Sequence, residues 1–193
     1  MKNDELQRMR LSRRQVLIGG AAAAFIGRPA RSIAAELSED GLYQQPWFLQ
    51  SFLDLREDLQ GAKAADKTFV VLWELKGCPF CKLLHMENFA NPTIARYAES
   101  NFAFLQLNFI GSRPVTDFDD RTLPEKQLAE RYAIEGTPTL QFFHEDGAGN
   151  AEELGRTQYL KPESFYGMLR FVREKGYETR PFDEWISAHP AQL

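Results

Sequence analysis

The amino-acid sequence predicts an α/β fold in which a mixed β-sheet is flanked by helices. Two stretches rich in apolar residues, 69–73 and 102–109, have the length and composition of buried strands. A helical stretch separates them, so together they form a βαβ unit, whose strands pair in parallel. A third strand at 140–143 is followed by a glycine-rich turn and a return strand over 152–157, which is the pattern of an antiparallel hairpin.

Helices are expected before and after the first strand. Aromatic residues and leucines fall at helical spacing over 46–60, with a proline in the first turn. This stretch is predicted as an amphipathic helix that buries Phe52 with its other apolar residues. The helix after the first strand is expected to run to about residue 89, to be interrupted, and to resume over 92–100.

The second half of the chain contains a loop, two helices and a tail. Residues 110–123 include glycine, proline and charged residues without periodicity, and are expected to form a long surface loop before a helix at 124–132. The final helix of the domain begins at Pro162, with apolar residues at helical spacing. The domain is predicted to cover 46–176, and the tail over 177–193 is expected to lie against it as a short extra segment.

Residues 1–34 have the features of a twin-arginine export signal in their usual order. A polar start leads to Arg13 and Arg14, then to a weakly apolar run over 16–27, then to small residues at 32–34 where a signal peptidase would cleave. The apolar run is too short to span a membrane, so we expect an exported, periplasmic protein without a membrane anchor after cleavage. The alternative is a buried N-terminal helix with an accidental arginine pair.

Cleavage after residue 34 would leave an acidic protein. The removed segment carries seven of the 23 basic residues and two of the 27 acidic residues, so 16 basic and 25 acidic residues remain, a net charge of about −9. This charge argues against nucleic-acid binding. The new N-terminal segment, 35–45, is polar and mixed in composition and is expected to be flexible.

The two cysteines of the chain lie in the sequence Cys78-Pro79-Phe80-Cys81, shortly after the first strand. A helix is predicted to begin here, which places both sulfur atoms on one turn, close enough to form a disulfide and to open it reversibly. Unpaired N–H groups and the helix dipole would stabilise a thiolate at Cys78, and Pro79 fits the first turn. A disulfide that closes so short a loop adds little stability, so the motif predicts thiol–disulfide exchange.

In the predicted mechanism, the Cys78 thiolate attacks a disulfide of a partner protein, and Cys81 then attacks Cys78 and releases the reduced partner. Pro79 and Phe80 help to set the reduction potential. The residues leave the direction of electron flow open, so a disulfide oxidase is the alternative to a reductase.

His85 extends the motif to C-x-x-C-x-x-x-H, which raises the alternative of a copper or zinc site formed by Cys78, Cys81 and His85. No fourth ligand is evident in the sequence, and about two helical turns, roughly 10 Å, separate His85 from Cys78. We therefore expect no metal and no cofactor other than the redox-active disulfide. His85 is expected to be solvated or locally hydrogen-bonded, and close enough to influence the pKa values of the thiols. A third interpretation, a binding module with an inert disulfide, conflicts with the exposed position expected of the motif.

The order of elements and two motifs resemble the thioredoxin fold over about 46–175, with the first helix as an N-terminal extension. The motifs are G-C-P-F-C around the cysteines and G-T-P-T at 136–139. The resemblance implies that Pro138 is a cis-proline lying against the disulfide. It also implies that Thr137 offers its backbone to a bound substrate strand. The expected substrate-contacting residues are Thr137, Pro79 and Phe80.

A narrower resemblance is to the SoxW-type periplasmic thioredoxins, which accompany sulfur-oxidation systems. It rests on C-P-F-C-K-L-L-H, on T-D-F-D at 116–119, on T-P-T-L-Q-F-F and on Y-L-K-P-E-S-F from Tyr159. This resemblance implies a reductase of cysteine-bearing periplasmic proteins, which receives electrons from a CcdA-like membrane transporter.

The sequence departs from thioredoxins proper at two positions. They carry a buried aspartate six residues before the first cysteine, thought to help move the proton of the resolving thiol, and this position is Leu72 here; the tryptophan before that cysteine is Gly77. Glu74 shares the face of Leu72 in an alternating strand, so it is a candidate proton relay. The sequence favours a solvated glutamate at the strand end instead, because acidic residues are seldom fully buried.

Overall fold

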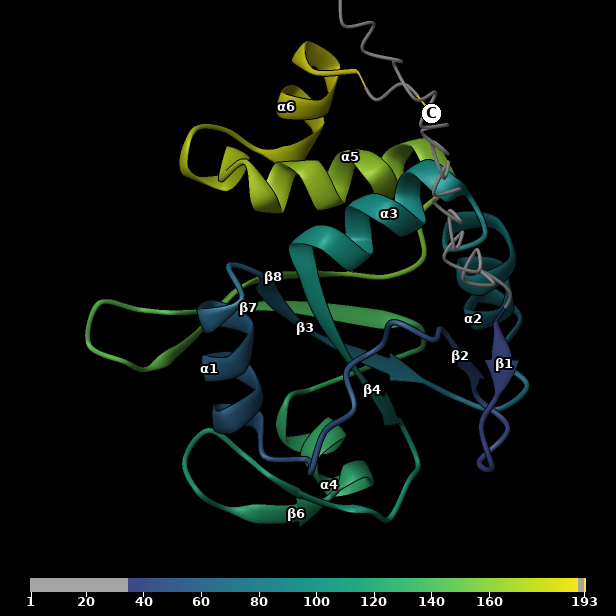
Figure 1. Cartoon of the computed structure of the whole chain (residues 1–193), viewed down its shortest axis with the longest axis vertical. Helices are drawn as coiled ribbons and strands as arrows, with labels where there is room; N and C mark the ends of the chain where they lie inside the picture. The colour runs from purple at the N-terminus through teal and green to yellow at the C-terminus, as the bar shows by residue number, and fades with distance from the viewer. Residues whose placement is uncertain (1–34, 191–192) are drawn as a thin grey trace, which may run out of the picture. The chain divides into compact units, whose positions relative to one another are not determined.

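Four strands form the central sheet of the domain, in the order β4-β3-β7-β8 (Figure 1). The computed structural model describes residues 35–190 and 193. Its central strands are β3 (Thr68–Glu74), β4 (Phe102–Asn108), β7 (Thr139–Glu145) and β8 (Ala151–Thr157). β3 runs parallel to β4, whereas β7 is antiparallel to both β3 and β8. The predicted βαβ unit and the hairpin that follows it are therefore confirmed.

Helices α1 (Leu55–Ala64) and α4 (Glu125–Arg131) cover one face of the sheet (Figure 1). Their apolar side chains belong to one core with alternate residues of β3, namely Phe69, Val71 and Trp73.

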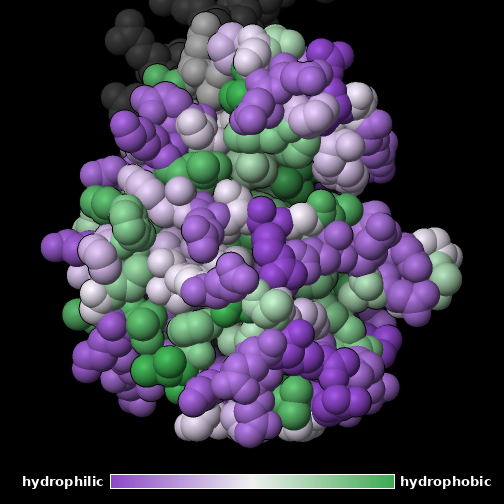
Figure 2. All heavy atoms as spheres, turned by 180° about the vertical axis from the view of Figure 1, so that it is seen from behind, coloured by the Kyte–Doolittle hydropathy of each residue, from purple (hydrophilic) through white to green (hydrophobic). Residues whose placement is uncertain are grey.

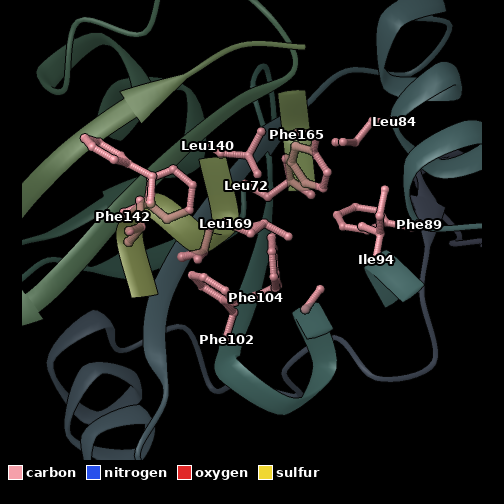
Figure 3. Close-up of a cluster of buried hydrophobic side chains, with 14 of the residues drawn as sticks. Leu72, Leu84, Phe89, Ile94, Phe102, Phe104, Leu140, Phe142, Phe165 and Leu169 are labelled. Carbon is pink, nitrogen blue, oxygen red and sulfur yellow. The ribbon is translucent and has the colours of Figure 1, made fainter. Parts of the chain in front are cut away.

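The opposite face carries the helices that follow β3 and β8. They are α2 (Pro79–Leu83), the π-helix η1 (Leu84–Asn88), α3 (Pro92–Asn101) and α5 (Pro162–Arg173). Figure 3 shows Phe89, which directly follows η1, and side chains of these helices gathered with Leu72 and Leu140 of the sheet in a second core. The interrupted helix after β3 is confirmed, but a single turn of it is π-helical, a rare geometry that often occurs at functional sites.

The segment 35–45, predicted to be flexible, forms a small antiparallel hairpin instead. Its strands are β1 (Glu36–Leu37) and β2 (Tyr43–Gln44). The hairpin is ordered because Leu42 is buried in the domain and the N–H of Gly41 donates to the carbonyl of Ser38 at 2.9 Å.

The predicted helix over 46–60 begins only at Leu55. Asp54 is its N-cap, since the Asp54 carboxylate accepts hydrogen bonds from the N–H groups of Arg56 and Glu57, both at 3.0 Å. The chain before Asp54 is irregular, and Phe52 is 96% exposed rather than buried.

Residues 110–123 are more ordered than the predicted surface loop. They contain β5 (Pro114–Thr116) and the start of β6 (Thr122–Pro124), which pair antiparallel and bury Val115. The buried Asp117 carboxylate accepts a hydrogen bond from the Tyr132 hydroxyl and lies 3.0 Å from Nε of Arg131. These two partners lie at the end of α4, so the hairpin is attached to that helix.

The C-terminal tail lies against the domain, as expected. It contains η2 (Gly176–Glu178) and α6 (Phe182–Ala188), and Trp185 of α6 packs 5.6 Å from the ring of Phe171 in α5. Figure 2 shows polar side chains intermixed with small apolar areas on the side of the molecule turned away from the viewer in Figure 1. Among the described residues, no helix has the length and apolar character needed to cross a membrane. The predicted export signal over 1–34 lies outside the described residues.

Substitution of Phe89 by alanine is expected to lower the free energy of unfolding by about 3–5 kcal/mol. The Phe89 ring is fully buried, at centroid distances of 5.2 Å from Trp47 and 5.6 Å from Phe165. Phe52→Ala is the matched control, because it removes an exposed ring and should change stability by less than about 0.5 kcal/mol. Urea unfolding monitored by circular dichroism measures both values, and equal losses would contradict the assignment of the core.

Candidate active site

The dithiol lies where β3 ends and α2 begins. Gly77 has a φ of +79°, a left-handed conformation that glycine adopts without strain, and it turns the chain into the helix. Cys78 is the N-cap of α2 and Pro79 occupies the first turn. The N–H of Cys81 donates a hydrogen bond to Sγ of Cys78 at 3.1 Å, so the two side chains lie on one turn, as the spacing predicted.

The two cysteines differ in exposure. Both are free thiols; Cys78 is partly exposed, whereas Cys81 is 3% exposed. Burial raises the pKa of the Cys81 thiol, and the negative charge of Glu74 raises it further. An incoming disulfide therefore reaches Cys78 first, and Cys81 lies behind it as a protonated thiol.

Strand pairing brings a second loop against Cys78. Trp73 near the end of β3 pairs with Thr139 at the start of β7. The residues just before β7 therefore lie at the same end of these strands as the cysteines. The Cys78 thiol donates a hydrogen bond to the carbonyl oxygen of Thr137 at 3.3 Å. The peptide bond between Thr137 and Pro138 is cis.

Glu74 is buried, so the expectation of a solvated glutamate was wrong. Its side chain lies on the face of Leu72, as alternation predicted, and is 1% exposed. Nε2 of His85 lies 3.1 Å from both carboxylate oxygens, and the amide nitrogen of Gln106 donates to Oε2. These donors compensate the carboxylate for its lost hydration.

His85 is also buried, and it is hydrogen-bonded rather than solvated. Its Nδ1 lies 3.1 Å from Nε2 of Gln45, and its Nε2 faces Glu74. Both ring nitrogens are thus hydrogen-bonded within the protein, which leaves neither free for the alternative of a copper or zinc site with the cysteines. Within the described part of the chain, no three His, Cys, Asp or Glu side chains are grouped so that they could hold a metal ion.

A family model described as a thioredoxin-like domain matches residues 55–173, which is more than half of the chain. The chain belongs to the thioredoxin-like family. Its fold and its dithiol make this thioredoxin-like protein a thiol–disulfide oxidoreductase. A search of the curated proteins gives no match.

Several solved structures are similar to this thioredoxin-like protein. A thioredoxin from Thermus thermophilus is 29% identical, with a TM-score of 0.50, over 62% of this chain and 84% of that one. A thioredoxin-fold protein from Helicobacter pylori is 17% identical, with a TM-score of 0.52, over 69% of this chain and 92% of that one. A protein named DsbH oxidoreductase is 15% identical, with a TM-score of 0.47, over 90% of this chain and 95% of that one.

A pocket of about 130 Å³ lies beside Thr137, the residue whose carbonyl accepts the hydrogen bond from Cys78. It is lined by Phe80, Thr137, Pro138, Gln158 and Tyr159. The Phe80 ring is 53% exposed and lies 5.6 Å from the ring of Tyr159. Three of the lining residues, Phe80, Thr137 and Pro138, were predicted site residues. Gln158 and Tyr159 were not, because they precede α5 and reach the pocket only through the fold.

Replacement of Glu74 by glutamine is expected to lower the pKa of Cys81, because it removes a negative charge that raises this pKa. NMR titration of the cysteine Cβ resonances in the reduced protein measures the change. Glu125→Gln is the matched control, since Glu125 is equally buried but bonds to Arg113 on the other side of β4. An unchanged or higher pKa in the Glu74 variant would contradict this account.

Proposed function

We propose that this thioredoxin-like protein is an exported reductase of disulfides in partner proteins. The observation that carries the proposal is the asymmetric dithiol: a partly exposed Cys78 beside the Thr137 carbonyl, with a buried Cys81 one helical turn behind it. The Cys78 sulfur can react with a large partner protein, while the Cys81 sulfur stays buried. A two-step exchange requires one thiol that attacks the partner and a second thiol that releases it.

The proposed reaction has two displacements. The Cys78 thiolate attacks one sulfur of the partner disulfide, forms a mixed disulfide, and expels the other partner sulfur as a thiolate. The Cys81 sulfur then attacks Sγ of Cys78, forms the Cys78–Cys81 disulfide and releases the second partner thiolate. The partner gains two electrons and the dithiol loses them, so a donor must reduce the protein again.

The substrate is proposed to be an extended segment of a protein. Thr137 presents its backbone next to Cys78, and the pocket formed with Phe80 and Tyr159 offers an apolar site for a residue that flanks the reacting cysteine. Aromatic walls provide contact area that does not depend on a particular sequence, which suits an enzyme with several partners.

The cellular setting is proposed from the sequence. The twin-arginine signal over 1–34 supports export to the periplasm, and the motifs shared with SoxW-type thioredoxins support cysteine-bearing partners in sulfur oxidation. An oxidising compartment requires that electrons be delivered across the membrane, so a CcdA-like transporter is the proposed donor.

Two serine variants test the order of attack. Cys81→Ser should accumulate a lasting mixed disulfide with partner proteins, because the second displacement is absent. Cys78→Ser should accumulate none, because the buried Cys81 does not meet the partner. Non-reducing electrophoresis of the variants after exposure to a periplasmic extract measures the trapped species, and the reverse pattern would overturn the assignment.

Phe80→Ala is expected to raise the KM for a protein disulfide such as insulin about tenfold, because it removes one wall of the pocket. Reduction of a small disulfide reagent should be unchanged, since that reagent needs only Cys78. Phe52→Ala removes another exposed ring, one that does not line the pocket, and serves as the control. An unchanged KM for insulin would show that the pocket takes no part in substrate binding.

A further inference from the structure

A hollow of about 500 Å³ lies beside the loop that contacts Cys78. Its walls are residues 133–135 after α4, Thr139 at the start of β7, and residues 156–158 at and just after the end of β8. The carbonyl that accepts the hydrogen bond from Cys78 belongs to the short segment 136–138, which connects the first wall to the second. The hollow is therefore next to the place where a partner disulfide must approach.

The hollow and the pocket beside Thr137 share one wall, the side chain of Gln158. A Cβ added to Gly136 would lie 3.4 Å from Nε2 of Gln158, so the Gln158 amide lies against the loop between the two spaces. A partner segment that places an apolar side chain against Phe80 and Tyr159 can therefore extend past Gln158 into the hollow. The hollow would then receive a different residue of the same segment.

Two charged side chains line the hollow, Glu135 and Arg156, and only one of them is neutralised within the protein. Nε and Nη2 of Arg156 donate to the two carboxylate oxygens of Glu153 at 2.7 and 2.6 Å. The third nitrogen of the guanidinium, Nη1, donates to the carbonyl of Tyr132 at 2.8 Å. The positive charge of Arg156 is thus compensated by Glu153, and its donors are directed at the protein itself.

Glu135 is exposed, and its carboxylate has no ion pair and no hydrogen bond in the described part of the chain. Hydrogen bonds hold the backbone on both sides of it. The N–H of Ile134 donates to the carbonyl of Ala129 at 2.9 Å, and the hydroxyl of Thr139 donates to the carbonyl of Gly136 at 2.7 Å. The hollow therefore presents an uncompensated negative charge from a fixed backbone position.

Glu135 is close enough to the reacting sulfur to contact a residue that flanks the partner cysteine. It precedes Thr137 by two residues, which span at most about 7 Å, and the Thr137 carbonyl lies 3.3 Å from Sγ of Cys78. An extended partner segment advances about 3.3 Å per residue. A residue two or three positions from the partner cysteine therefore covers the same distance.

We propose that Glu135 binds a lysine or arginine of the partner protein that lies two or three residues from the reacting cysteine. The inference rests on the proposed exchange reaction and defines the class of segment that this reaction favours. Residues 35–193 carry 16 basic and 25 acidic residues, a net charge of about −9, which also attracts basic segments at longer range. An acidic residue at the same position of the partner would face Glu135 and be disfavoured.

Synthetic peptides test the preference. Each has a single cysteine joined by a disulfide to nitrothiobenzoate, so attack by Cys78 on the peptide sulfur expels this coloured thiolate and leaves the peptide bound to Cys78. The peptides differ only in a lysine, glutamine or glutamate two residues before the cysteine, or two residues after it in a second set. Each rate constant is divided by that of the same peptide with dithiothreitol, which removes differences in intrinsic reactivity.

In one of the two sets, the unmodified protein should react about fivefold faster with the lysine peptide than with the glutamine peptide at low salt, the effect of an exposed ion pair. The glutamate peptide should react more slowly than both. Glu135→Gln should abolish the preference for lysine. Glu135→Lys should reverse it in favour of glutamate, a change that a purely structural role of Glu135 would not produce.

Glu130→Gln is the matched control. Glu130 is also exposed and without a side-chain partner among the described residues, but it does not line the hollow, so its variant should keep the preference. Equal rates for lysine and glutamate peptides in both sets, or the same preference in Glu135→Gln as in the unmodified protein, would overturn the proposal. If the unmodified protein released nitrothiobenzoate no faster than Cys78→Ser, the exchange reaction itself would fail instead.

Discussion

The register between β3 and β7 pairs Trp73 with Thr139, and the contact between Cys78 and Thr137 depends on it. Cys78 follows β3 by a few residues and Thr137 precedes β7 by two, so only short segments connect them to the sheet. The two cores on either side of β3 hold this register, because a shift by one residue would exchange their side chains. The sheet thus determines where the redox site forms, although its reacting atoms lie on loops and on the first turn of a helix.

The same strand ends in a buried charge. Alternation along β3 turns Glu74 toward the π-helical turn, where His85 and Gln106 supply its donors. Thioredoxins proper place an aspartate two residues earlier, at the position of Leu72. Here the acid stands closer in sequence to the first cysteine and has a titratable partner. The family's fold therefore keeps an acid near the resolving thiol while the position and the partners of that acid differ.

Local patterns in the sequence predicted the parts of the fold that local chemistry determines. The strands, the break before α3 and the dithiol at a helix start follow from periodicity, proline placement and cysteine spacing. The errors concern residues whose environment is set by distant parts of the chain. Gln45 and His85 are 40 residues apart, and neither Glu74 nor His85 could be recognised as buried without the hairpin that covers them. Phe52 fitted a helical pattern, but the Asp54 cap starts the helix after it.

We propose that the Cys78–Cys81 couple donates electrons to partner disulfides. Its reduction potential can be measured by equilibrating the purified protein in dithiothreitol or glutathione buffers. A reductase should have a potential near that of thioredoxin, about −270 mV, at which the dithiol is a reductant that a membrane donor must reduce again after each reaction. A value near −120 mV would contradict it, because such a disulfide is a strong oxidant and would place the protein among the disulfide-forming enzymes.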